Sequence, residues 1–168
     1  MRRHEQGKEW LELREDRRAT RSLLWTGVIL GVGVIGALDE IVLHQLLQWH
    51  NFYVHTTQFW RIFSDGVFHL ASSALLLFGA FRLWRDRRLL SEVGSARALV
   101  AGVFLGMGAF NLYDGTVQHK LLRLHPVRED VANQLPYDVG FIGIAALLLA
   151  TGWYLWRGVQ AETQKSSR

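Results

Sequence analysis

Residues 26–50, TGVILGVGVIGALDEIVLHQLLQWH, align without a gap on residues 101–125, AGVFLGMGAFNLYDGTVQHKLLRLH, and 11 of the 25 positions are identical. Glycines and aliphatic residues make up most of the identities in the first half of each stretch. In the second half, one Asp and two His recur at the same spacing. Apolar helices that touch in lipid need small residues, and ionisable residues within a membrane segment mark functional sites. The repeat therefore predicts a duplicated helix that carries a duplicated half-site.

Around this repeat lie four long apolar runs that contain no Lys, Arg, Asp or Glu, at 23–38, 66–81, 98–113 and 139–156. Such runs are typical of membrane-spanning helices, which need about 20 residues each. We expect the spans at about 22–45, 62–84, 97–119 and 137–157. The predicted fold class is all-α: a polytopic membrane protein whose four-transmembrane-helix bundle consists of two parallel-repeat hairpins.

Glycines four residues apart occur at the same place in both repeats, as Gly27 with Gly31 and Gly102 with Gly106. Small residues at this spacing allow the backbones of two helices to approach closely. We therefore expect the first and third spans to cross near these glycines.

The 168-residue chain has a net charge of +4 and no cysteine, which excludes disulfides, thiolate metal sites and thiol catalysis. Of its 19 Lys and Arg residues, 15 lie in the segments 1–21, 82–97 and 157–168. This asymmetry predicts a multi-pass membrane protein with both termini in the cytoplasm. Basic segments of this kind attract anionic lipid, so the bilayer is the expected partner and nucleic acid is not.

The charge pattern also divides the chain. We expect a cytoplasmic basic segment at 1–21, a four-helix transmembrane domain at 22–157 and a cytoplasmic tail at 158–168. The connections 45–62 and 119–137 then face the outer side of the membrane. A second copy of the chain is a candidate partner.

On that outer side, each apolar run ends at an aspartate: Asp39, Asp65, Asp114 and Asp138. Asp39 and Asp114 would lie near helix C-termini, where the helix dipole disfavours a negative charge, so capping does not explain them. His44 and His119 follow them by five residues, a rotation of about 140° in a regular α-helix. A π-bulge or a break would bring each Asp and His into line, and π-bulges are frequent at functional sites.

His69 follows Asp65 by four residues, which places both on one face of the second span. We therefore predict a metal site near the outer face, with ligands drawn from His44, Asp65, His69, His119, Asp39 and Asp114. Residues expected beside this site or at its outer rim are Glu40, His50, His125, Asp138, Lys120 and Arg128. In the second repeat Ile142 takes the place of His69, so we expect the site to be specialised around Asp65 and His69.

Carboxylates and imidazoles without thiolates favour a divalent transition metal such as Zn, Cu or Fe. The Glu-x-x-His pairs of di-iron bundles and the HExxH motif of zinc proteases are absent. Three uses stay open. The site could bind and hand over a metal, or serve a membrane-embedded metal-dependent hydrolase in which the metal activates water. Alternatively, His44 and His119 could be a symmetric pair that ligates haem or relays protons.

Four strings in the chain are also specific enough to compare with a known family: DEIVLHQLLQWH (39–50), DGVFH (65–69), DGTVQHKLLRLHPVR (114–128) and YD (137–138). They resemble the bacterial four-span membrane protein family known as domain of unknown function 2243, over nearly all of 22–157. The resemblance implies a location in the bacterial inner membrane. Glu40 departs from the resemblance, which implies a Gly there, as in Asp114-Gly115. Family members are similar in gene neighbourhood to copper-delivering assembly factors of cytochrome oxidase. The resemblance therefore implies a copper or respiratory role, with respiratory oxidase assembly proteins as partners.

Overall fold

The computed structural model describes residues 2–165, and the side chains of residues 14–164. Its long helices are α1 (Arg2–Asp39), α2 (Gln58–Arg85), α3 (Ser95–Tyr113) and α4 (Leu135–Lys165). Two π-helices, η1 (Glu40–Leu46) and η3 (Asp114–Leu121), extend α1 and α3, and a short 3-10 helix, η2 (Arg87–Ser91), follows α2. Four helices are long and apolar enough to cross a membrane, and the described residues form no strand. The predicted class, an all-helical four-span membrane bundle, is confirmed.

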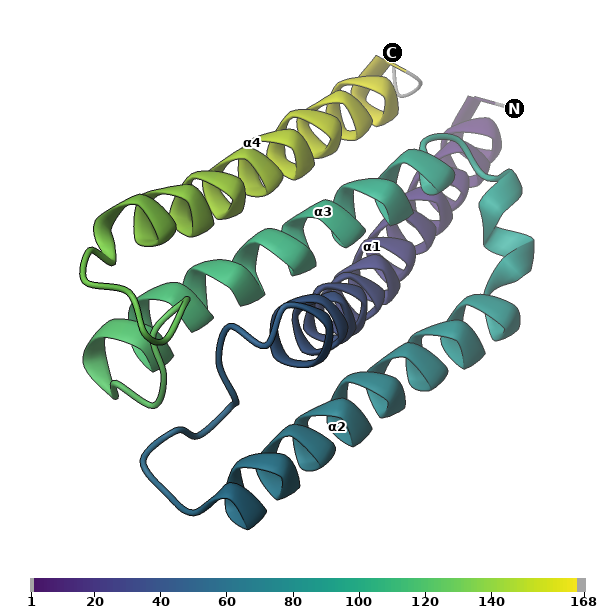
Figure 1. Ribbon diagram of the computed structural model, residues 1–168. Helices are drawn as coiled ribbons and strands as arrows, with labels where there is room; N and C mark the ends of the chain where they lie inside the picture. Colours follow the sequence, from purple (N-terminus) through teal and green to yellow (C-terminus); the bar gives the residue numbers. More distant parts are fainter. Residues whose placement is uncertain (1, 166–168) are drawn as a thin grey trace.

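The four helices lie in the order α2, α1, α3, α4, with α1 and α3 in the centre (Figure 1). α2 packs on α1, and α4 packs on α3. The start of α1, the end of α4 and η2 lie at one end of the bundle, which we call the terminal end (Figure 1). The π-helices and the two long loops lie at the other end, which we call the loop end.

The central helices touch through glycine. A Cβ atom added to Gly27 would lie 2.1 Å from the carbonyl oxygen of Leu99, and one added to Gly102 would lie 2.1 Å from that of Leu24. Gly31 and Gly106 approach the partner backbone equally closely. Because no side chain fits at such distances, only glycine allows this crossing. The predicted contact between the first and third spans is confirmed, and it recurs at positions 75 residues apart.

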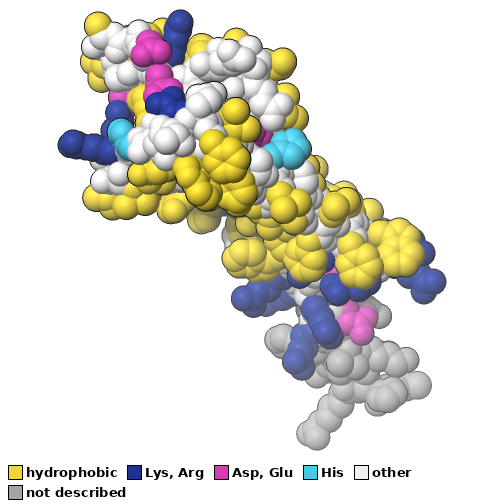
Figure 2. Space-filling view, turned by 60° about the horizontal axis from the view of Figure 1, so that its bottom comes forward, with side chains coloured by type: hydrophobic (Ala, Val, Ile, Leu, Met, Phe, Trp, Pro, Cys, Tyr) yellow, Lys and Arg dark blue, Asp and Glu magenta, His cyan; other side chains and the backbone are white. Residues whose placement is uncertain are grey.

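The outer helices present apolar side chains outward. Leu70 and Leu77 on α2 are 69% and 73% exposed, and Leu147 and Tyr154 on α4 are 70% and 77% exposed. Figure 2 shows hydrophobic side chains spread over the body of the molecule, with Lys and Arg gathered toward its ends. An exposed apolar surface of this extent is the surface of a protein in contact with lipid.

The terminal segments are more helical than the charge pattern alone indicates. α1 runs without a break from Arg2, so the basic segment expected at 1–21 is part of the first long helix, and residue 1 lies outside the described part. The expected tail at 158–168 is helical as far as Lys165, whereas residues 166–168 lie outside the described part. At this end Arg97 pairs with Glu162, which joins α3 to α4.

Candidate metal centre

Both π-helices bring an aspartate and a histidine together. The backbone N–H after each π-helix donates to the carbonyl five residues earlier, at 2.9 Å after η1 and 2.7 Å after η3. The wider turn removes the rotation that would separate residues five apart in an α-helix. His44 Nε2 therefore lies 3.4 Å from Asp39 Oδ2, and His119 Nε2 lies 2.9 Å from Asp114 Oδ2. Of the two local structures left open by the sequence, the bulge is the one that forms.

A second pair of histidines folds back onto the first pair. Gln48 and Arg123, just beyond the π-helices, both have a φ of 50°, a left-handed conformation that reverses the chain. His50 and His125 follow two residues later, and each is only 2% exposed. The expectation that these two rings lie at an outer rim is therefore corrected, because the chain reversal turns both of them inward.

We call His44, His50, His119 and His125 the histidine cluster. The rings of His50 and His125 stack with their centroids 4.5 Å apart and their planes at 9°. His44 meets His50 edge-on at 4.5 Å, and His119 meets His125 in the same way at 4.6 Å. The two halves of the cluster thus have nearly the same geometry.

Several ring nitrogens of the cluster are buried without a partner. His50 Nδ1 lies 2.8 Å from the carbonyl oxygen of Val127. Because a carbonyl only accepts, Nδ1 carries the proton and Nε2 keeps its lone pair. That Nε2, together with Nδ1 of His125 and Nδ1 of His119, is buried with no hydrogen-bond partner in the described part of the chain. Unpaired buried polar atoms cost about 1–3 kcal/mol each, so these nitrogens indicate a site for a ligand.

Two of these rings are neutral at physiological pH. Burial lowers the pKa of His50 to about 4, and the charge of His44 acts in the same direction. Burial likewise lowers the pKa of His125 to about 2, with a further contribution from His50. Neutral imidazole is the form that binds a metal ion.

Carboxylates gather on the His44 side of the cluster. His44 Nδ1 lies 2.9 Å from Glu40 Oε2 and 3.2 Å from Asp65 Oδ1. Glu40 is fully buried, and Asp39 is only 8% exposed. Among the described residues, no Lys or Arg pairs with these three carboxylates. Buried negative charge needs a compensating cation, which protonated His44 or a metal ion can supply.

Asp65 also holds the loop that carries His50. Its carboxylate accepts hydrogen bonds from the backbone N–H of Phe52 at 2.7 Å and from the side-chain amide of Asn51 at 2.6 Å. These bonds tie the start of α2 to the chain just after His50. The structure thus places Asp65 against both His44 and the loop.

The second half of the site is less acidic. Asp138 pairs with Lys120, whose side chain is 53% exposed. Gly115 stands where the first half has Glu40, and a Cβ atom added to it would lie 2.7 Å from Ile142 Cδ1. Ile142 therefore fills the space beside position 115. Carboxylates therefore gather in the first half of the site, where Glu40 and Asp65 both lie beside His44.

His69 is not brought to the cluster. The face of α2 that packs inward passes through Asp65, Phe68 and Ser72, and the Phe68 ring lies 5.9 Å from that of His44. Four residues advance an α-helix by about 40° more than a full turn, and at this position the difference turns His69 outward. Its side chain is exposed and makes no hydrogen bond or ion pair within the described residues. The expected ligand role of His69 is therefore corrected.

The remaining rim residue, Arg128, lies outside the cluster. Its guanidinium covers the rings of Trp49 and Tyr137, with its carbon 5.2 and 5.4 Å from their centroids, and donates to the Tyr137 hydroxyl at 2.7 Å.

Two polar groups were missed by the sequence reasoning. The carbonyl of Val127 carries no side-chain signal, whereas Asn111 was detectable as the only amide in its apolar run.

The family described as "Predicted membrane protein (DUF2243)" matches residues 26–159. The chain belongs to the DUF2243 family. The DUF2243 segment contains the whole histidine cluster and all of the carboxylates around it. Comparison with curated proteins and with solved structures gave no match. DUF2243 membership agrees with the four spans and assigns no chemistry to them.

Proposed function

We propose that this DUF2243 protein binds a divalent transition metal in the histidine cluster. The observation that carries the proposal is the convergence of His50, His119 and His125, which each offer one ring nitrogen within 4.8 Å of the others. All three residues are buried, and each has a nitrogen without a hydrogen-bond partner in the described residues. The carbonyl of Val127 orients His50 as such groups orient metal-ligating histidines. We call this set the nitrogen-rich position.

A second position lies beside it. Glu40, His44 and Asp65 also offer ligand atoms within 4.8 Å of one another, and Asp39 groups with His44 and His50 in the same way. We call Glu40, His44 and Asp65 the oxygen-rich position. Its three residues are distinct from those of the nitrogen-rich position, so the two positions do not compete for ligands. Oxygen and imidazole ligands suit Zn, Fe or Cu(II), and the lack of thiolates disfavours Cu(I).

In the membrane, the site would open on the outer side. The 15 Lys and Arg residues in segments 1–21, 82–97 and 157–168 support a cytoplasmic position of the terminal end. The loop end would then lie on the outer side of the membrane. A buried metal site at that place suits a protein that receives or hands over an ion, and respiratory oxidase assembly is the use implied by the family resemblance. The rings of His50 and His125 stack 4.5 Å apart, and His44 and His119 each contact one of these two rings at about 4.5 Å, which leaves no gap for a porphyrin and disfavours haem.

Metal counting on the purified full-length protein tests the proposal. The protein in detergent is loaded with Zn²⁺, Fe²⁺ or Cu²⁺, and unbound metal is removed by desalting. The bound metal is then quantified by inductively coupled plasma mass spectrometry. Wild type is expected to retain stoichiometric metal, and Cu²⁺ is expected to show nitrogen hyperfine splitting in its electron paramagnetic resonance spectrum. The variants His50→Gln and His125→Gln should each lose the ion of the nitrogen-rich position.

His69→Gln is the matched control, because His69 is exposed and lies one turn from Asp65. It should retain as much metal as wild type. The proposal fails if no metal can be loaded into wild type, or if His69→Gln loses as much metal as His50→Gln. A Soret band in the visible spectrum of the purified protein would favour haem instead.

A further inference from the structure

The side-chain amide of a buried asparagine has no role in the proposed metal centre. Asn111 on α3 is 5% exposed, and its side chain makes no hydrogen bond within the described residues. Polar residues within a membrane span usually serve a function, and Asn111 lines a cavity into which a partner could fit. Asn111 is therefore free to pair with a molecule bound in that cavity.

That amide lies in a cavity of about 460 Å³, which we call the α1/α4 cleft. The cleft runs between α1 and α4, and Asp39 is the other strongly polar group in it. Its walls include the aromatic rings of Trp49, Tyr137 and Phe141. Leu38 and Ile144, which also line it, are 45% and 54% exposed on the outer surface, so the cleft opens sideways toward lipid.

We propose that the α1/α4 cleft binds a neutral, lipid-soluble molecule with a phenolic head group and an apolar tail. The carboxylate of Asp39 accepts a hydrogen bond from the phenol hydroxyl and repels an anionic head group. The Asn111 amide pairs with the same hydroxyl, and the aromatic walls contact the ring. The tail leaves between Leu38 and Ile144 into the bilayer. The volume is within the range of small-molecule sites and suits a ring with a short length of chain.

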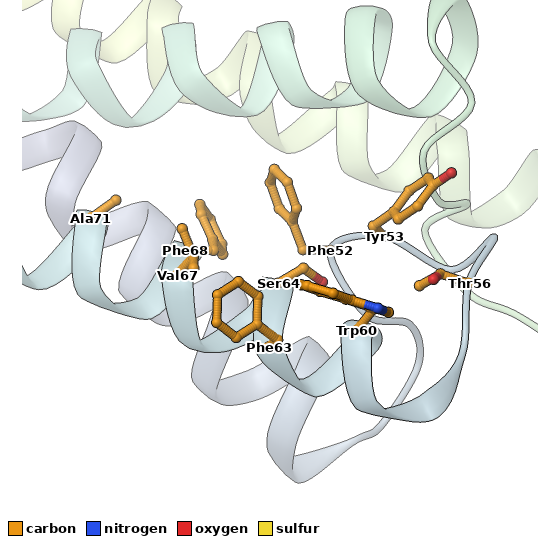
Figure 3. Close-up of a pocket in the computed structure, with 9 residues that line it drawn as sticks. All are labelled: Phe52, Tyr53, Thr56, Trp60, Phe63, Ser64, Val67, Phe68 and Ala71. Carbon is orange, nitrogen blue, oxygen red and sulfur yellow. The ribbon is translucent and has the colours of Figure 1, made fainter.

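A second cleft at the equivalent place in the other repeat provides an internal comparison. It has a volume of about 560 Å³ and lies between α2 and the loop at 52–56, lined chiefly by aromatic and aliphatic side chains (Figure 3). Val67 lines it where Gly140 lines the α1/α4 cleft. The residue equivalent to Asn111 is Gly36, and neither an amide nor a carboxylate side chain lines this cleft. We call it the α2 cleft, and its hydroxyl groups come from Tyr53, Thr56 and Ser64.

The site goes beyond the metal centre, because Asn111 belongs to none of the metal-binding groups and Asp39 belongs to neither the nitrogen-rich nor the oxygen-rich position, although it groups with His44 and His50. The cleft does not require a bound ion. The test uses the full-length, metal-free protein in lipid nanodiscs and a decyl-phenol that carries a photoreactive diazirine in its tail. After illumination, the labelled residues are located by peptide mass spectrometry. Labelling is expected on the α1 and α4 residues of the α1/α4 cleft, and unlabelled decyl-phenol should compete for it.

Two variants and a control define the site. Gly140→Leu places a side chain at the wall of the cleft, where an added Cβ atom meets nothing within 4 Å, and it should abolish labelling. Asn111→Leu removes one hydrogen bond and should weaken competition by decyl-phenol about tenfold. Val67→Phe fills the α2 cleft instead and should leave labelling unchanged.

The inference is overturned if labelling is equal in the two clefts, if Gly140→Leu labels as wild type does, or if decanol competes as well as decyl-phenol. Metal retention is measured on the same Gly140→Leu protein. Retained metal with lost labelling shows that the variant folds and that the cleft is a separate site. Labelling of a wild type that binds no metal would support the cleft and refute the metal centre.

Discussion

Removing the charge of Asp65 should loosen the loop that carries His50. The Asp65 carboxylate accepts hydrogen bonds from the backbone of Phe52 and the side chain of Asn51, at 2.7 and 2.6 Å. A hydrogen bond to a charged group contributes about 1.5–3 kcal/mol, so the two bonds together contribute about 3–6 kcal/mol. In Asp65→Asn, one oxygen remains as a weaker, neutral acceptor. We therefore expect the free energy of unfolding to fall by about 2–4 kcal/mol.

Two measurements on the full-length protein check this expectation. Titration with dodecyl sulfate in mixed micelles gives the free energy of unfolding. Hydrogen exchange of peptides covering residues 47–57 reports the loop directly, and it should become faster in Asp65→Asn. Metal affinity should fall as well, because Asp65 belongs to the oxygen-rich position and its loop presents His50 to the nitrogen-rich position.

The repeat supplies the control. Asp138 is the equivalent aspartate of the second half, and its partner Lys120 has a half-exposed side chain. Exposed ion pairs contribute at most about 1 kcal/mol, so Asp138→Asn should have a small effect on unfolding. The reasoning is refuted if Asp138→Asn destabilises the protein as much as Asp65→Asn does, or if exchange in the loop is unchanged in Asp65→Asn.

Three further outcomes follow from the packing and the charges. Gly27→Leu should destabilise the protein by about 3 kcal/mol or more, because its Cβ would lie 2.1 Å from a backbone oxygen, whereas Gly66→Ala meets nothing and should be neutral in the same unfolding titration. The free energy of unfolding of the metal-free protein should fall as the pH falls from 6.5 toward 4, by up to about 1.4 kcal/mol per pH unit for each ring. The cause is that folding lowers the pKa of His50 and His125, so that the unfolded chain binds protons at a higher pH than the folded protein does. The pH dependence should be shallower in His50→Gln, and equal slopes would refute this cause. Without a ligand, Asn111→Leu should be at least as stable as wild type in thermal unfolding, because it removes an unpaired buried amide.

The fold was predictable because its determinants are local in the sequence. Uncharged apolar runs mark the spans, and glycines at equal positions of two repeats mark the helix crossing. The side-by-side order of the helices is harder to predict from the sequence, because it depends on which faces of α2 and α4 pack against α1 and α3. The full length of α1 and α4 could not be predicted from the apolar runs, because charged residues continue a helix as readily as they end an apolar run.

The site was predictable in composition and only partly in geometry. The equal spacing of Asp and His indicated a π-bulge or a break, because a regular α-helix would separate the two side chains, but it did not decide between them. The inward position of His50 and His125 depends on the left-handed backbone conformation of Gln48 and Arg123. Neither Gln nor Arg is a residue type that favours this conformation, so the sequence does not indicate it. The outward position of His69 depends on which of two neighbouring residues faces α1, a difference that spacing alone does not resolve.

Glu40 is the one departure from the repeat that places a buried charge in the site, and replacing it tests how many ions the site holds. Glu40→Gly makes the first half resemble the second, where Gly115 leaves no carboxylate. The nitrogen-rich position keeps all three of its ligands, whereas the oxygen-rich position loses one.

If the two positions bind separate ions, the metal content of Glu40→Gly should fall by one equivalent and the nitrogen hyperfine signal of bound Cu²⁺ should remain. Glu40→Gln, which keeps the side chain and its hydrogen bond with Gln45 but removes the charge, should weaken the second ion about 10–100-fold. Loss of all metal in Glu40→Gly would show that the carboxylates and the histidines hold a single ion together. Retention of all metal would show that the negative charge of Glu40 is balanced by a protonated His44, and that the acidic half of the repeat holds a proton where the proposal places a metal.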